Sequence, residues 1–179
     1  SSRGEKLPHY TEVGVGFSKM CLTPMLEYGR QALEDNKKGV ATEALEQVAL
    51  AIVVTTAIVS IFLTRDFTPD YNSGLAHACF YALTAYPVIE KEHLHGEVVG
   101  FGVLYALLVD GQQEEFEKIY ALNKELGLPV RIADIGITEE QFFETMDRIP
   151  QMSDIRHYPY VVTKEMLMQA YETIEQLSI

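Results

Sequence analysis

The sequence contains few cysteines, few basic residues and no tryptophan. Its 2 cysteines cannot form a disulfide framework, and neither stands in a Cys-x-x-Cys pair, so we expect a reduced, cytoplasmic setting. Lys and Arg number 14 against 26 Asp and Glu, which gives a formal charge of −12. Because this balance repels phosphate backbones and anionic lipid surfaces, we expect neither a nucleic-acid nor a membrane partner.

Long uninterrupted apolar runs are also lacking. The longest near-apolar stretch, 48–63, is interrupted by Thr55, Thr56 and Ser60 and is shorter than the roughly 20 residues of a membrane span. It therefore predicts a buried core helix. The polar first residues contain no signal-peptide segment, and the chain starts without Met, so we expect a piece of a longer protein.

Helical signals follow one another along the chain, without a strand series or an internal repeat. Thr42 and Thr138 are typical N-caps, and the acids and glutamine after Thr138 complete a capping box. Pro24 should kink or interrupt the first helix. The predicted helices are 11–36, 42–63, 74–85, 95–110, 113–126, 138–149 and one from residue 163 onward. We expect a single all-α domain, a helical bundle over residues 1–179.

The helix expected over 95–110 has an unusual composition. No charged residue lies between Glu97 and Asp110, which predicts burial nearly all round. Gly96, Gly100 and Gly102 lower its helix propensity, and we expect a neighbouring helix to approach closely in return.

Common catalytic motifs are absent from the sequence. Gly14-Val15-Gly16 and Gly100-Phe101-Gly102 lack the GxGxxG pattern, and no GxSxG, HExxH or Walker-type loop occurs. Cys79 lies in an apolar helix and is interpreted as a core residue rather than a nucleophile. No catalytic residue is assigned.

Histidine is the informative residue type, because three of the 5 histidines fall within 77–95. His77 lies inside an apolar helix and His95 starts the next long one; two imidazoles plus a carboxylate suit zinc or iron. The structural alternative is a core His77 and a solvated His95, and the spacing leaves both open. His93 is expected in a solvated loop, and His9 and His157 in surface segments.

The sequence resembles the C-terminal helical domain of the iron-containing alcohol dehydrogenase superfamily, and most closely its glycerol dehydrogenase branch. Two histidine motifs, Ala76-His77-Ala78 and His95-Gly96-Glu97, carry the resemblance, which runs from about Lys19 onward. The supporting segments are Leu26-Glu27-Tyr28-Gly29, Leu83-Thr84-Ala85, Val98-Val99-Gly100-Phe101-Gly102 and Asp134-Ile135-Gly136-Ile137-Thr138.

The resemblance implies a divalent metal, zinc or iron, held by one Asp and two His, and it assigns the histidines to His77 and His95. The Asp and a nucleotide-binding domain for NAD would precede Ser1. The intact protein would then be an NAD-dependent, metal-assisted dehydrogenase of a small polyol or alcohol, and a homo-oligomer. The chain alone would be inactive.

Two departures from the family pattern support a different class of function. Phe80 replaces a second His of the relatives, and the helix entry 70–73 contains little glycine. A metal-free helical interaction module, or an inactive relative, is therefore the alternative. A phosphorylated substrate is a weaker third interpretation, because no Arg/Lys pair lies near the histidines.

Overall fold

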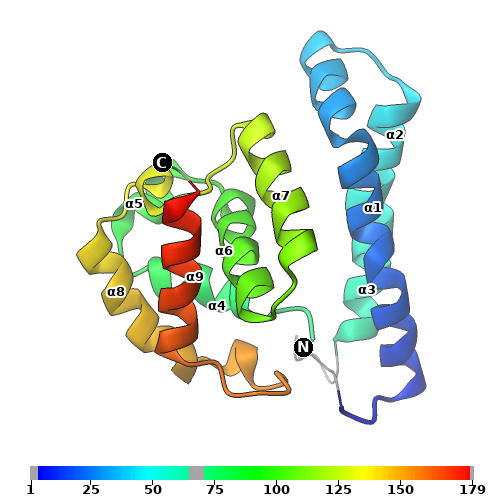
Figure 1. Ribbon diagram of the computed structural model, residues 1–179. Coiled ribbons are helices and arrows are strands. Elements are labelled where there is room, and N and C mark those ends of the chain that lie inside the picture. Colours follow the sequence, from blue (N-terminus) through cyan, green and yellow to red (C-terminus); the bar gives the residue numbers. More distant parts are fainter. Residues whose placement is uncertain (1–3, 65–70, 178–179) are drawn as a thin grey trace. The chain divides into compact units, whose positions relative to one another are not determined.

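The computed structural model describes residues 4–64 and 71–177, and within these ranges every regular element is helical (Figure 1). The expected all-α class is therefore confirmed. The described residues form two compact units, one of 4–64 with 71–72 and the other of 73–177. The expected single domain over residues 1–179 stays a prediction.

The first unit is a helical hairpin. Helix α1 (His9–Lys38) ends at Gly39 in the left-handed conformation, and its partner is a continuous helical run. The segments of this run are α2 (Glu43–Leu50), the π-helical η1 (Ala51–Thr55) and α3 (Thr56–Leu63). Pro24 lies inside α1, which continues past it, so the expected interruption is absent: proline removes only one hydrogen bond of the ladder.

A short polar network closes the hairpin. Thr42 accepts the Leu45 N–H at 3.3 Å as the expected N-cap, and its hydroxyl donates to Asp35 at 2.6 Å. Gln31 donates to the other oxygen of Asp35 at 2.7 Å. These hydrogen bonds lower the pKa of the Asp35 carboxyl and connect the end of α1 to the start of α2.

The apolar helical run is not the buried core helix that the sequence predicts. It extends over Glu43–Leu63, 21 residues, and only 11% of its apolar window is buried. Val53 and Ile61 are 69% and 72% exposed. The physical reason is that α1 alone packs along this run within its unit, so most of its circumference has no partner there. By length and composition it is the one helix in the described ranges that could cross a membrane, a test that core helices also pass.

The second unit packs helices around an aromatic core. Its elements are α4 (Leu75–Leu83), α5 (Pro87–Glu92), α6 (His95–Val109), α7 (Gln113–Leu126), η2 (Ile132–Ile135), α8 (Glu139–Arg148), η3 (Ile149–Gln151), η4 (Ser153–Ile155) and α9 (Lys164–Gln176). Phe101 and Tyr105 of α6 lie within 6.0 Å of Phe142 of α8, ring centroid to ring centroid. The short α5 was not expected; Pro87 begins it, a position where its missing N–H costs no hydrogen bond.

Helix α6 is fully buried along one face and half-buried elsewhere between Val98 and Val109, so the expected burial nearly all round is met in part. Val98, Phe101, Gly102, Leu104 and Tyr105 are buried, whereas the other residues from Val99 to Val109 remain partly accessible. Helices α4 and α6 cross where Gly102 meets Ala76: a Cβ at Gly102 would lie 2.6 Å from the Ala76 carbonyl oxygen. The expected close approach is thus confirmed at Gly102 and wrong at Gly96 and Gly100, where a Cβ would meet nothing within 4 Å.

This contrast predicts opposite effects of the same substitution at two positions of α6. Gly102→Ala should lower the free energy of unfolding by about 1–3 kcal/mol, because the backbones must separate. Gly100→Ala should raise it by about 0.5–1 kcal/mol, because alanine favours the helix and has room. Urea unfolding followed by circular dichroism measures both, and equal effects would contradict the crossing.

Candidate metal-binding site

The start of α4 is held by a residue distant in sequence. Gly74 caps α4 without a side chain, and the Leu75 N–H donates to the Tyr158 hydroxyl at 3.1 Å. A Cβ at Gly74 would lie 3.5 Å from that hydroxyl oxygen, so the contact is close. The bond satisfies one of the amides that a helix N-terminus leaves unpaired, and it places His77 in the first turn.

The start of α6 is organised by Glu97. Its carboxylate accepts the Leu94 N–H at 3.0 Å and lies 3.6 Å from Nδ1 of His93. A carboxylate in the first turn also interacts favourably with the positive end of the helix dipole. This arrangement places His95 as the first residue of α6. The side chain of His93 is only 15% exposed, so the expectation of a solvated His93 is wrong: its ring lies against Glu97.

The structure brings His77 and His95 together. Their ring centroids lie 5.8 Å apart, at an interplanar angle of 45°. Phe80 packs edge-on against His95 at 4.4 Å, and Tyr81 lies 6.4 Å from His77. His77 is half-buried and His95 exposed. His9, at the start of α1, is exposed as expected, and His157 is half-buried beside Arg156, whose Nε lies 3.1 Å from its Nε2.

Burial lowers the pKa of His77, and the neighbouring His95 lowers it further, while Asp154 acts in the opposite direction. A lowered pKa keeps this imidazole neutral at neutral pH, the form that donates an electron pair to a metal. Two imidazoles at this separation suit two ligands of one zinc or iron ion. Among the described residues, no group of three or more His, Cys, Asp or Glu could hold a metal ion.

The sequence pointed to the two histidines but not to Tyr158 and Asp154. Tyr158 reaches α4 from a loop far along the chain. Asp154 lies in the short helix η4, which packs against α4. Neither residue belongs to a motif or a periodic pattern, so no local signal marks them.

Cys79, next to this site in sequence, is confirmed as a core residue. Its side chain is fully buried, and burial raises the pKa of its thiol to about 12. Such a thiol stays protonated and inert at neutral pH.

The two cysteines should therefore react very differently with a thiol reagent. We expect Cys21, partly exposed on α1, to be alkylated by iodoacetamide in the native protein, and Cys79 to react only after unfolding. Peptide mass spectrometry after native and denatured labelling measures this. Labelling of Cys79 at a rate similar to Cys21 would contradict its place in the core.

Comparison with known proteins finds no matching family model but clear relatives. The chain is 31% identical over 134 residues to a glycerol dehydrogenase of Escherichia coli, covering 73% of this chain and 33% of that protein. It is 28% identical over 169 residues to a glycerol dehydrogenase of Thermotoga maritima, covering 89% and 43% respectively. The chain thus spans less than half the length of these relatives.

A solved structure shares the fold. The crystal structure of a probable glycerol dehydrogenase from Sinorhizobium meliloti matches with a TM-score of 0.73 at 21% identity, over 93% of this chain and 46% of that one.

Proposed function

We propose that this chain, a homologue of the glycerol dehydrogenases of the iron-containing alcohol dehydrogenase superfamily, is the helical metal-binding part of an NAD-linked dehydrogenase of a small polyol or alcohol. The observation that carries the proposal is the pairing of the His77 and His95 rings at 5.8 Å. The chain spans less than half of its relatives, which leaves room for a nucleotide-binding domain and for the third donor.

The roles of the residues follow from their surroundings. His77 and His95 would hold the metal, and His77 is kept neutral by burial. Tyr158 fixes the first turn of α4, and Glu97 fixes the first turn of α6, so each histidine is carried by a capped helix start. When bound, zinc or iron supplies a Lewis acid that favours ionisation of a substrate hydroxyl.

Phe80 has a separate role as a positioning residue. No hydrogen bond orients the His95 ring within the part of the chain that the structure describes, and the ring is exposed. The edge-on contact with Phe80 at 4.4 Å and the ring of His77 are what hold it. Phe80 also shields one side of the imidazole from water.

The metal content of the whole protein tests the ligand assignment. His95→Ala should lower bound zinc or iron at least tenfold, because one of two imidazole ligands is lost. His9→Ala, which changes an exposed histidine at the start of α1, is the control and should retain the metal. Elemental analysis after gel filtration measures both variants. Equal metal content in wild type and His95→Ala would overturn the assignment.

The role of Phe80 predicts a spectroscopic change that does not depend on activity. Phe80→Leu should remove the ring-current shift of the His95 ring protons and weaken binding of added Zn²⁺ about tenfold, because the imidazole is no longer held in one orientation. Phe143→Leu, which changes a half-buried aromatic ring packed on Tyr171, is the control. Unchanged His95 signals and unchanged Zn²⁺ affinity in Phe80→Leu would contradict the role.

A metal-free helical interaction module, or an inactive relative, is the alternative from another class. It is favoured by the lack of a third donor among the described residues. Under this alternative, neither Zn²⁺ nor a chelator changes the melting temperature of the wild type. Under our proposal, Zn²⁺ raises that temperature, and replacing both histidines by glutamine abolishes the effect.

A further inference from the structure

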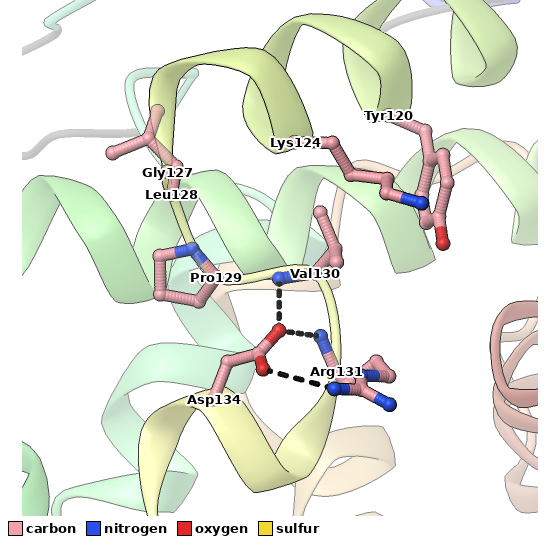
Figure 2. Close-up of a pocket in the computed structure, with 8 residues that line it drawn as sticks. All are labelled: Tyr120, Lys124, Gly127, Leu128, Pro129, Val130, Arg131 and Asp134. Atoms are coloured by element: carbon pink, nitrogen blue, oxygen red, sulfur yellow. Dashed lines mark hydrogen bonds and ion pairs between the residues drawn. The ribbon is translucent and has the colours of Figure 1, made fainter. Parts of the chain in front are cut away.

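A hollow lies at the C-terminal end of α7, and its lining residues include neither His77 nor His95 (Figure 2). Its volume is about 490 Å³. The C-terminal half of α7, the loop that follows and η2 border this open hollow. Figure 2 shows the amine of Lys124 at the Tyr120 ring and the side chain of Arg131 beside Asp134.

The loop beside the hollow is fixed by its own backbone. Gly127 ends α7 in the left-handed conformation, at φ 71°, and Pro129 restricts the next turn. Asp134 then accepts the N–H groups of Val130 and Arg131 at 3.0 and 2.9 Å. The wall that carries Arg131 is therefore preformed, which reduces the entropy lost on binding a ligand.

The charged groups of the hollow are only partly used by the protein. Nη2 of Arg131 lies 3.6 Å from Asp134, which occupies one edge of a guanidinium with five N–H donors. The amine of Lys124 lies 5.6 Å above the Tyr120 ring, a cation–π distance. Two cations and one carboxylate line this hollow, in a chain with a formal charge of −12.

Three other lysines are paired more closely with carboxylates than either cation of this hollow. Lys37, Lys118 and Lys164 form ion pairs of 2.6–2.9 Å with neighbouring carboxylates. Another hollow, near α8, combines Lys164 with four acidic side chains. The ion pair of Arg131 with Asp134 and the cation–π contact of Lys124 with Tyr120 each involve a neighbour in sequence. Neither contact explains why both cations border the same hollow.

We propose that this hollow binds a small organic anion, a carboxylate or phosphate group on a compact apolar body. Lys124 and Arg131 hold the oxyanion, since an ammonium and a guanidinium fork are the groups that bind carboxylate and phosphate. Leu128, Pro129 and the Tyr120 ring contact the apolar body. The site is separate from the histidine pair and does not depend on the proposed dehydrogenase function.

Titration with three probes tests the site: inorganic phosphate, phenyl phosphate and benzoate, at constant ionic strength. Isothermal calorimetry measures affinity, and ¹⁵N spectra locate the perturbed amides. We expect saturable binding of the two aromatic probes that is tighter than that of phosphate, with shifts at 127–134. Tighter phenyl phosphate identifies a phosphate ligand, and tighter benzoate a carboxylate.

The matched variants are Lys124→Gln, Arg131→Gln and Lys118→Gln. The first two should each weaken binding about tenfold, because each removes a charge-assisted hydrogen bond. Lys118 lies on the same helix but outside the hollow, so Lys118→Gln should change nothing. Arg131→Gln should fold, since Asp134 holds this loop through backbone amides.

Two results would overturn the proposal. The first is the absence of saturable binding of either aromatic probe at millimolar concentration. The second is an equal loss of affinity in Lys118→Gln and Lys124→Gln, which would show that the net charge of the helix alone causes the effect.

Discussion

The contact between the backbones of α4 and α6 is the constraint on which the histidine site depends. At Gly102 no side chain separates the two helices, and the carbonyl of Ala76 occupies the space that a Cβ would take. Because His77 follows Ala76 directly in sequence, the distance between α4 and α6 at this crossing sets the position of the His77 ring relative to α6. A wider separation would move His77 and Phe80 away from His95 together. The site therefore depends on a packing contact that contains no functional group.

The ends of helices provide the functional groups of both candidate sites. His77 and His95 lie in first turns, and Lys124 lies in a last turn. Helix ends leave amides and carbonyls unpaired, and here Tyr158, Glu97 and Asp134 satisfy the amides of helix starts or of the adjoining loop. The groups that cap the backbone thereby fix the places where imidazole, ammonium and guanidinium groups are displayed.

Local features could be predicted from the sequence, and contacts between distant residues could not. Thr42, Thr138 and Thr163 cap helices because a hydroxyl reaches amides three residues away, a signal contained in a few letters. The histidine pair was accessible only through the resemblance, since spacing alone left the core alternative open. Tyr158 contacts Leu75 across the fold, and burial of α6 or of the run 43–63 depends on which neighbours are present. Neither the Tyr158 contact nor the burial of these helices can be predicted from one segment of the sequence.

The apolar run Glu43–Leu63 also has a consequence during biosynthesis. Ribosomes release the chain from its N-terminal side, so the first unit is complete before residues 73–177 have been made. During that interval α1 is the partner that packs along this run within its unit, and Val53 and Ile61 are exposed to water. Exposed apolar surface of this kind is what holdase chaperones bind. The order of synthesis thus leaves the apolar face of this hairpin uncovered while residues 73–177 are still being made.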